Sequence, residues 1–381
     1  MRIVADENIP LLDAFFAEQG EIATHAGRAI TREHLLQADA LLVRSVTQVT
    51  PELLAGTPVR FVGTCTIGTD HLDLPGLKSA GVSVASAPGC NARGVVEYVL
   101  SCLLTLAERT GQPWRGRRVG IIGVGEVGGR LAATLGALGV DCLLCDPPRA
   151  ERGEPGFVSL DTLLAQADVL SCHVPLLKQG AHATQHLLDA TRLANLKPGT
   201  WLINSSRGPV IDNAALVALL PRRPDLQVAL DVWEHEPQVN LALAAQCALA
   251  SPHVAGYSLD GKLRGTEQIY RAFCAHFQVP AAHTLSELAP SAGLASLTMD
   301  AQTPSDWTLS KALRLVYDVR DDDARFRAAM VGLIEGEEQI AQRFDQLRKH
   351  YPLRRECSHL GLLSAAGAPA PADWSAAGFS C

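Results

Sequence analysis

Long apolar runs are missing from this sequence of 381 residues, and charged residues are few. No stretch approaches the roughly 20 consecutive apolar residues of a membrane-spanning helix. The first residues, Met1–Asp6, have the pattern of a short buried strand and lack the apolar core and cleavage site of a signal peptide. We therefore expect a cytoplasmic protein with no membrane partner.

Cysteine and histidine residues occur nowhere at the spacing of zinc ligands, although the chain has ten cysteines. Cys142 and Cys145 form a C-x-x-C pair, but the residues around them have the pattern of a core strand, whereas a redox pair normally opens a helix. We expect these cysteines to be structural thiols, and we expect no metal site.

A basic excess is absent as well, because the net charge is −7. This charge disfavours general nucleic-acid binding and leaves room for a local basic pocket that binds an anionic substrate. The length exceeds what one hydrophobic core usually holds, so we expect two or three domains.

Short apolar strands alternate with helical patterns over the first part of the chain, which is typical of a parallel α/β sheet. The expected strands are residues 3–5, 40–43, 61–63 and 82–85, and the expected helices are residues 11–19, 32–37, 51–54 and 92–109. A second and stronger βαβ region runs from Val119 to about Pro252.

The composition changes near Pro280. Residues 281–306 are rich in alanine, serine and proline, whereas residues 308–317 and 323–350 have the spacing of helices. The tail after Leu363 is rich in alanine, glycine and proline, so we expect it to be loosely held.

The C-terminal extension carries apolar side chains that must be buried somewhere. They lie at helical spacing and comprise Leu309, Leu313, Val316, Phe326, Met330, Leu333, Ile334, Ile340, Phe344 and Leu347. They could fold onto their own subunit, but a symmetric homodimer is the favoured prediction, because two-fold dimers are the commonest soluble assembly. The basic run Arg348–Arg355 could then lie near a substrate cleft and help to bind a phosphate.

A glycine-rich turn indicates a nucleotide site in the second region. A strand beginning at Val119 runs into a G-x-G-x-x-G motif, and a helix follows. Gly123 permits the tight turn, Gly125 lets the backbone approach a pyrophosphate, and Gly128 lets helix and strand pack closely. The helix N-terminus then presents free N–H groups to the phosphates. A chance glycine-rich turn is the alternative, which the flanking strand and helix disfavour.

Asp146 closes the next strand at close to the expected distance of about 20 residues. A carboxylate there accepts hydrogen bonds from ribose hydroxyls and repels a 2′-phosphate, so it favours NAD over NADP. Arg149 is a counter-signal, and we expect Pro147 and Pro148 to turn that segment away.

Arg207, Glu236 and His253 each follow an apolar segment with the pattern of a strand, and strand ends are where doubly wound sheets bind ligands. A guanidinium matches the carboxylate of a 2-hydroxy acid. A histidine titrates in the range needed to remove the hydroxyl proton, and a carboxylate beside it fixes its tautomer. Taken singly, these could be a surface arginine, a turn acid and a satisfied histidine. Their order after the glycine motif favours a dehydrogenase of small 2-hydroxy acids.

With these motifs, the chain resembles the D-isomer-specific 2-hydroxyacid dehydrogenase family over about residues 1–278. The matching segments are G-x-G-x-x-G, N-x-x-R-G, D-V-x-x-x-E-P and P-H-x-A-G. The resemblance implies that Arg207 binds substrate and stabilises an oxyanion, that Glu236 partners the histidine, and that His253 is the acid/base. Together with the glycine motif it gives the expected NAD-binding set: Gly123, Gly125, Glu126, Val127, Gly128, Asp146, His173, Val174, Pro175, Ser205, Ser206, Arg207, Asp231 and Gly256.

The resemblance also implies the fold. It implies a Rossmann-type NAD domain inserted into a smaller flavodoxin-like α/β substrate domain, followed by a C-terminal α-containing extension. The expected substrate domain is residues 1–92 with 257–280, the NAD domain is residues 93–256, and a dimerisation domain is residues 281–381. The resemblance further implies a homodimer.

Four strings resemble a branch of the family that acts on a phosphorylated hydroxy acid, and they begin at Leu42, Gly63, Ser86 and Tyr351. This resemblance implies that Ser45, Thr66 and Tyr257 contact substrate. We add Arg44 and Arg93 as candidate anion contacts, for which ordinary structural arginines are the alternative.

Three alternatives stay open at this point. The chain could be another enzyme of the family, such as a 3-phosphoglycerate dehydrogenase or a hydroxypyruvate reductase. It could be a non-catalytic NAD-sensing module of the corepressor type, which the intact set of Arg207, Glu236 and His253 disfavours. It could also be a mainly structural dimeric scaffold, which would not need Asp146 and the glycine motif.

Overall fold

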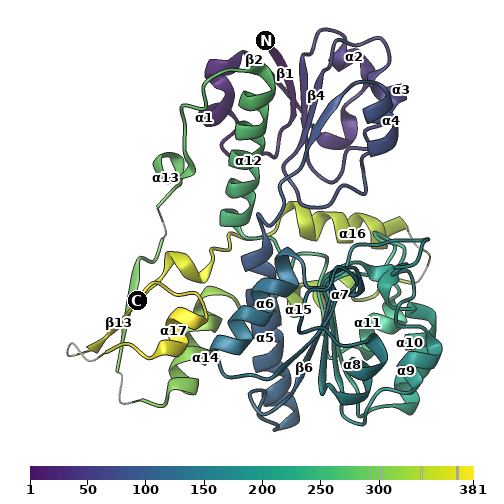
Figure 1. Ribbon diagram of the computed structural model, residues 1–381, viewed down its shortest axis with the longest axis vertical. Coiled ribbons are helices and arrows are strands. Elements are labelled where there is room, and N and C mark those ends of the chain that lie inside the picture. The colour runs from purple at the N-terminus through teal and green to yellow at the C-terminus, as the bar shows by residue number, and fades with distance from the viewer. Residues whose placement is uncertain (292, 301–302, 335, 337, 366–368) are drawn as a thin grey trace. The chain divides into compact units, whose positions relative to one another are not determined.

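The computed structural model describes residues 1–291, 293–300, 303–334, 336, 338–365 and 369–381. It divides the chain into two compact units (Figure 1). The first unit comprises Met1–Asn91 and Ser258–Ser291, and the second comprises Ala92–Tyr257 and Ala292–Cys381. The chain therefore leaves the first unit after Asn91 and returns to it at Ser258, and the C-terminal extension groups with the second unit.

The first unit is built on a five-stranded sheet of order β2-β1-β3-β4-β5, in which every pair is parallel. The strands are β1 (Arg2–Asp6), β2 (Glu21–His25), β3 (Ala40–Val43), β4 (Phe61–Thr64) and β5 (Ser83–Ala85). The four predicted strands are confirmed. The edge strand β2 was not predicted, because its half-exposed residues form no apolar run.

Helices cover this sheet, and most of them are short. They are α1 (Leu12–Phe16), α2 (Arg32–Leu35), α3 (Pro51–Leu54), α4 (Leu74–Ser79), α12 (Leu259–Phe277) and α13 (Leu285–Leu288), with 3-10 turns η1 (Ala17–Gln19) and η2 (Gly27–Ala29). Figure 1 shows α12, in green, alongside the strands. Its Tyr270 and Phe273 each lie with the ring centroid 5.4 Å from that of Phe16 on α1, in edge-to-face contact.

The second unit contains a six-stranded parallel sheet of order β11-β10-β9-β8-β6-β7. The strands are β6 (Val119–Ile122), β7 (Cys142–Cys145), β8 (Val169–Cys172), β9 (Trp201–Asn204), β10 (Gln227–Leu230) and β11 (Leu249–Ala250). The strand order reverses between β6 and β8, and such a reversal opens a ligand crevice at the carboxyl ends of the strands. The α/β fold with a Rossmann-type sheet is thus confirmed.

The C-x-x-C pair lies on strand β7, as predicted. Cys145 is buried, and burial raises the pKa of both the Cys142 and the Cys145 thiols to about 11. All ten cysteines are free. A thiol with so high a pKa is a poor nucleophile, so this pair has a structural role.

The helices of the second unit connect these strands. They are α5 (Ala92–Thr110), α6 (Glu126–Ala137), α7 (Pro147–Glu151), α8 (Leu160–Gln166), α9 (Ala190–Ala194), α10 (Asn213–Leu219) and α11 (Leu241–Gln246), with η3 (Gly208–Val210) and η4 (Leu220–Arg222). The predicted helix over residues 92–109 is confirmed as α5, which is buried from Val95 to Leu106.

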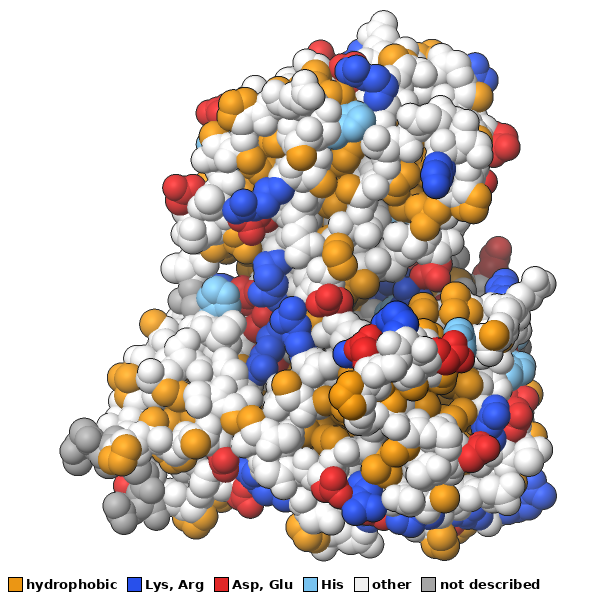
Figure 2. Space-filling model, in the orientation of Figure 1, with side chains coloured by type: hydrophobic (Ala, Val, Ile, Leu, Met, Phe, Trp, Pro, Cys, Tyr) orange, Lys and Arg blue, Asp and Glu red, His pale blue; other side chains and the backbone are white. Residues whose placement is uncertain are grey.

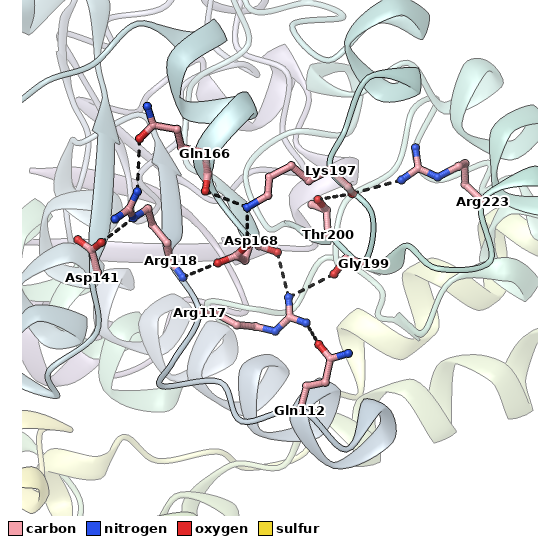
Figure 3. A network of polar contacts seen from close by, with 10 residues as sticks. All are labelled: Gln112, Arg117, Arg118, Asp141, Gln166, Asp168, Lys197, Gly199, Thr200 and Arg223. Atoms are coloured by element: carbon pink, nitrogen blue, oxygen red, sulfur yellow. Dashed lines mark hydrogen bonds and ion pairs between the residues drawn. The ribbon is translucent and has the colours of Figure 1, made fainter.

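A polar network closes the edge of this sheet where the strands begin (Figure 3). Asp168 precedes β8 and accepts a hydrogen bond from the Arg118 backbone N–H at 3.0 Å and from Lys197 Nζ at 2.6 Å. Arg117 donates to the carbonyl of Gly199, just before β9. These contacts join the amino ends of β6, β8 and β9, so the opposite edge is left for a ligand.

The C-terminal extension contains β12 (Ser296–Met299), α14 (Ser305–Val316), α15 (Val319–Met330), α16 (Glu338–Lys349), η5 (Cys357–His359), β13 (Gly361–Ser364) and α17 (Ala372–Ala376). The helical pattern over residues 323–350 is interrupted, because α15 ends at Met330 and Gly332 adopts a φ of +78°. Residues 366–368 of the tail lie outside the described residues, and for residues 369–381 the prediction of a loosely held tail is wrong. Trp374 and Phe379 are buried in the core of the second unit, where they contribute apolar area that alanine and glycine cannot.

The apolar side chains of the extension are buried mainly within their own chain. Six of the ten are buried in the two cores of the second unit: Leu309, Leu313, Phe326, Met330, Ile340 and Phe344. Only Ile334 of the set is well exposed, at 68%, and its neighbour Val331 is 77% exposed. The need to bury this surface therefore gives little support to the predicted dimer.

Among the described helices, none combines the length and apolar character that crossing a membrane requires. On the face shown in Figure 2, acidic and basic side chains are interspersed on both units.

Candidate active site

A histidine and a glutamate at the ends of adjacent strands form the centre of the candidate site. Glu236 follows β10 and His253 follows β11, and these strands pair in parallel. His253 Nδ1 lies 2.7 Å from Glu236 Oε2, and Glu236 Oε1 accepts the Trp233 backbone N–H at 2.7 Å. Because Nδ1 faces the glutamate, Nε2 is the nitrogen placed for proton transfer.

The glutamate is held in its ionised form. Burial raises the pKa of the Glu236 carboxyl, but His253, the Trp233 N–H and Arg348 together lower it by more, so the pKa lies below its ordinary value. An ionised carboxylate at this position stabilises a protonated imidazole.

Asp231, at the end of β10, fixes the backbone that carries the histidine. Its carboxylate accepts hydrogen bonds from the Ser251 hydroxyl at 2.7 Å and from the N–H groups of Val254 at 2.8 Å and Ala255 at 2.9 Å. Its carbonyl accepts the His253 N–H at 2.7 Å. His253 itself has a φ of +59°, an uncommon conformation for a side-chain-bearing residue, which these contacts maintain.

Arg207 follows β9, the strand next to β10. Its Nη1 donates to the Ser206 carbonyl at 2.8 Å, and its own carbonyl accepts from Asn204 Nδ2 at 3.0 Å. Arg207, Glu236 and His253 thus follow three adjacent strands, β9, β10 and β11, at one edge of the sheet, as the sequence predicted.

The glycine motif has the conformation that a nucleotide site needs. Gly123 adopts a φ of +86°, and a Cβ on Gly128 would lie 1.9 Å from the Gly123 carbonyl oxygen, so a larger residue is excluded at both positions. Apart from its two neighbours in the chain, no described residue has an atom within 4 Å of where a Cβ on Gly125 would be. Gly125 precedes α6, which begins at Glu126 without a side-chain cap. The uncapped N–H groups and the open space above Gly125 fit a bound dinucleotide phosphate.

Asp146 caps α7 and contacts the glycine loop. One carboxylate oxygen accepts the Val124 N–H at 2.9 Å, and the other accepts the Arg149 N–H at 3.2 Å. The expectation that the two prolines carry Arg149 away is wrong, because its Nη1 donates to the Val124 carbonyl at 2.7 Å. Arg149 is, however, paired with Glu154 at 2.6 Å, which offsets its charge.

Further predicted cofactor residues lie at the ends of β8 and β9. The His173 N–H donates to the Ile122 carbonyl at 2.7 Å, and burial lowers the pKa of the His173 imidazole to about 4, so it is neutral. A Cβ on Gly123 would contact Val174, which places this side chain against the glycine turn. The Ser205 hydroxyl is buried without a hydrogen-bond partner in the structure. A buried hydroxyl without a partner, at the same end of the sheet as the glycine loop, fits a site in which a ligand supplies the missing hydrogen bond.

Pro175 lies beyond this strand end, and its carbonyl accepts the Thr184 hydroxyl. Ser206 donates its hydroxyl to Asn204 Oδ1 at 2.9 Å. Gly256 lies in the turn after His253, and Val127 and Glu126 lie in the first turn of α6.

Predicted substrate residues of the first unit cluster at strand ends. Ser45 and Arg44 follow β3, and Thr66 follows β4, which pairs with β3. The Thr66 hydroxyl lies 2.8 Å from that of Thr64. Lys262 of α12 was missed by sequence reasoning: burial and then the nearby Arg44 lower the pKa of its ammonium to about 8.

Two of the predicted substrate residues, Arg93 and Tyr257, lie in the second unit. Arg93 pairs with Glu97 at 3.2 Å, and a Cβ on Gly378 would overlap its guanidinium. Arg93 thus lies against the C-terminal tail, which favours the alternative of an ordinary structural arginine. Tyr257 lies in edge-to-face contact with Tyr351, with 5.6 Å between ring centroids.

Sequence reasoning missed the contacts that the extension makes with the site. Trp233, beside Glu236, stacks on Phe326 of α15 with parallel rings 5.5 Å apart. The guanidinium of Arg348 on α16 lies over Tyr257, 5.6 Å from the ring centroid. No local pattern in the sequence signals either pair.

One group of potential metal ligands occurs among the described residues, namely His186, Asp212 and Glu234. His186 Nε2 lies 2.6 Å from Glu234 Oε1, and Glu234 also accepts the Asn213 N–H at 3.1 Å. These contacts join the loop after β10 to the start of α10, so the group has a structural explanation.

The fold and the site together define a nucleotide-dependent dehydrogenase. Residues 104–255 match the family described as D-isomer specific 2-hydroxyacid dehydrogenase, NAD binding domain, and residues 288–372 match a family described only as a domain of unknown function. The chain is 59% identical to the erythronate-4-phosphate dehydrogenase of Pseudomonas savastanoi pv. phaseolicola, over 94% of each chain. It is 56% identical to that of Azotobacter vinelandii, over 97% of this chain and 96% of the other.

The chain therefore belongs to the D-isomer-specific 2-hydroxyacid dehydrogenase family, and it is an NAD-dependent enzyme. Solved structures share the fold. D-lactate dehydrogenase from Aquifex aeolicus, complexed with NAD and lactic acid, aligns with a TM-score of 0.62 at 22% identity, over 73% of this chain and 96% of the other. NAD-bound 3-phosphoglycerate dehydrogenase from Entamoeba histolytica aligns with a TM-score of 0.63 at 21% identity, over 73% and 95%.

Proposed function

We propose that this enzyme oxidises 4-phospho-D-erythronate at C2 to 3-hydroxy-2-oxo-4-phosphooxybutanoate, as a step in the synthesis of pyridoxine and pyridoxal phosphate. The observation that carries this proposal is the similarity to erythronate-4-phosphate dehydrogenases over nearly the whole chain, extension included. The solved neighbours align with only about three quarters of the chain, so the fold alone does not select this substrate.

In the proposed mechanism, His253 Nε2 takes the proton from the C2 hydroxyl. Glu236, fixed on Nδ1 at 2.7 Å, holds the ring and stabilises the imidazolium that forms. Arg207 binds the substrate carboxylate with paired hydrogen bonds and stabilises the developing negative charge on O2. When bound, NAD supplies the two-electron oxidant for C2.

The residues proposed to hold NAD surround the carboxyl ends of β6 to β10. Gly123, Gly125 and Gly128 admit the pyrophosphate, and Asp146 takes the ribose hydroxyls with acceptor capacity left beyond its two backbone contacts. The other members are Glu126, Val127, His173, Val174, Pro175, Ser205, Ser206, Arg207, Asp231 and Gly256.

We propose that a substrate domain of residues 1–92 with 257–280 supplies Ser45, Thr66, Arg44 and Tyr257 to the substrate. Tyr257 stands at the boundary, because the structure groups it with the second unit. We further propose a cytoplasmic homodimer in which the extension, residues 281–381, makes the subunit contact. The free cysteines support a reducing compartment, and the exposed Val331 and Ile334 support a subunit contact.

The test is an assay of NADH formation with 4-phospho-D-erythronate and with 3-phospho-D-glycerate in separate reactions. A keto-acid acceptor is added in parallel so that slow cofactor release does not hide turnover. We expect a much higher kcat/KM with the four-carbon acid. Preference for 3-phosphoglycerate would assign the enzyme to another branch of the family, and binding of NAD without turnover of either acid would favour a sensing module.

A further inference from the structure

The C-terminal extension is packed directly against both loops that carry the catalytic pair. Phe326 of α15 stacks on Trp233, whose N–H holds Glu236. Asp323 of α15 accepts the Ala250 N–H of β11 at 2.8 Å, just before His253. The extension thus packs against the segments that carry Glu236 and His253.

The segment after α16 is anchored by Arg354. This buried guanidinium donates to the Ala255 carbonyl at 2.9 Å and to the Gly94 carbonyl at 2.6 Å, and it lies 3.5 Å from the centroid of the Tyr317 ring. Arg354 is only 4% exposed, so it is a structural tie and does not bind substrate. Arg354 is therefore removed from the basic run that was expected to help bind a phosphate. Arg348, at the start of the same run, is the arginine that lies over Tyr257.

Arg348 is a cation on α16 whose guanidinium lies beside two aromatic side chains. Its guanidinium lies 5.6 Å from the centroid of Tyr257 and 5.8 Å from that of Phe344, between two aromatic side chains. Its Nε is buried without a hydrogen-bond partner. Burying a guanidinium N–H without a hydrogen-bond partner costs free energy, and a bound anion would remove this cost.

The groups around Arg348 favour its charged form. Burial lowers the pKa of the Arg348 guanidinium, but Tyr257 and Glu236 raise it by more, so the group stays charged. Glu236 is fully engaged by His253 and the Trp233 N–H. The positive charge next to the catalytic pair is therefore available to a substrate anion other than the carboxylate that Arg207 would take.

We propose that Arg348, supplied by the C-terminal extension, binds the phosphate group at the far end of the substrate and so determines the specificity of the enzyme for phosphorylated acids. A guanidinium is suited to this role because its planar N–H groups match phosphate oxygens. The inference deepens the proposed function and rests on it. It also gives the extension a chemical reason to accompany the catalytic units.

The experiment compares substrates with and without the phosphate. The full-length wild type, Arg348→Gln and Arg348→Lys are assayed with 4-phospho-D-erythronate and with D-erythronate. We expect Arg348→Gln to lower kcat/KM for the phosphorylated acid by about 10- to 100-fold, mainly through KM. The loss with D-erythronate should be much smaller than the loss with the phosphorylated acid, and Arg348→Lys should recover part of the latter.

Arg343→Gln is the matched control, because Arg343 lies on the same helix with its side chain exposed. It should leave both substrates unaffected. Equal losses with the two acids for Arg348→Gln would overturn the proposal and make Arg348 a positioning residue of the catalytic pair. An unchanged kcat/KM for the phosphorylated acid would also overturn it and would favour Arg44 with Lys262 as the phosphate site.

Binding of inorganic phosphate to the NAD-loaded protein, measured by calorimetry, separates this proposal from the proposed function. We expect Arg348→Gln to weaken phosphate binding and Arg343→Gln to leave it unchanged. If the wild type oxidised neither acid but bound phosphate in an Arg348-dependent way, the proposed function would fail and the phosphate subsite would stand. Phosphate binding that is equal in wild type and Arg348→Gln would refute the subsite.

Discussion

At the residue scale, two acids divide the task of holding His253. Asp231 fixes the backbone of the loop through three accepted hydrogen bonds from side chain and main chain, and Glu236 fixes the imidazole ring. The two acids lie near each other in the sequence, but only Glu236 touches the histidine side chain. Substitutions at the two positions should therefore have different signatures, since one concerns folding and the other proton transfer.

Replacing His253 with alanine removes the proposed general base and leaves the nucleotide loop intact. We expect kcat to fall by about 10²–10⁴, the range typical of acid–base catalysis. The Kd for NAD, measured by fluorescence titration, should change by less than about threefold. A variant that kept most of the wild-type kcat would show that another group is the base.

Replacing Glu236 with glutamine tests the charge beside the histidine. Because the protonated imidazole loses its anionic partner, the acid limb of the kcat/KM profile should move to lower pH, with substrate binding retained. The pKa of Glu236 is lowered from an ordinary value of 4.5, so its ionised form stabilises the fold above that value, and this contribution is lost as the pH falls through the lowered pKa.

Urea unfolding of the wild type and of Glu236→Gln between about pH 6 and pH 3 measures how much the ionised Glu236 contributes to stability. The stability difference between wild type and Glu236→Gln should shrink as the pH falls. A difference that stays constant over this range would show that the charge of Glu236 does not contribute to stability.

Asp146 is expected to set the choice of nucleotide. Asp146→Ala should narrow the preference for NAD over NADP, because it removes both the ribose contact and the repulsion of a 2′-phosphate. The change is measured as the ratio of kcat/KM values for the two cofactors. Asp161→Ala, on the exposed part of α8, is a control that should keep the wild-type ratio. Equal use of both cofactors by the wild type would contradict the assignment.

At the scale of elements, helix α15 supports the catalytic loops from behind. Phe326 is 1% exposed and stacks on Trp233, so Phe326→Ala should cost about 3–5 kcal/mol of stability by opening a cavity. It should also lower kcat, because the loop that carries Glu236 loses its support. Phe16→Ala in the first unit is the control, with a similar stability loss expected. Urea unfolding measures the loss of stability, and kcat is measured at urea concentrations at which the variants are still folded. A wild-type kcat for Phe326→Ala would refute the supporting role of α15.

The elements that could be predicted are those whose signals are local. The strands that precede Arg207, Glu236 and His253 are short apolar runs with polar residues directly after them, and the glycine motif sits between a strand and a helix. Parallel pairing then brings their ends to one edge without further information. The first sheet was predicted for the same reason, apart from its edge strand β2.

The contacts of the extension could not be predicted, because they join residues that are distant in the sequence. Nothing near Trp233 indicates that Phe326 covers it, and nothing near Tyr257 indicates Arg348. The alanine-rich tail was misjudged from its average composition, although Trp374 and Phe379 within it were a signal of burial.

At the scale of the whole molecule, the proposed homodimer is tested through the exposed apolar residues of the extension. We expect the full-length chain of 40.5 kDa to behave as a species of about twice that mass in light scattering. A double variant, Val331→Asp with Ile334→Asp, should shift the population toward monomer, because charge is introduced into an apolar contact. Leu74→Asp in the first unit is the control, and a wild type that is monomeric at micromolar concentration would refute the dimer.

The chain order has a consequence for how the protein matures on the ribosome. Leu309 and Trp374 lie in the same core as β6 and β9, so the hydrophobic core of the second unit is incomplete until both residues have been synthesised. The first unit likewise waits for α12, which is made only after the inserted residues. Nascent chains should therefore acquire protease resistance only after Trp374 has left the ribosome. A messenger truncated even slightly before the codon for Trp374 would yield a product that chaperones retain and proteases remove.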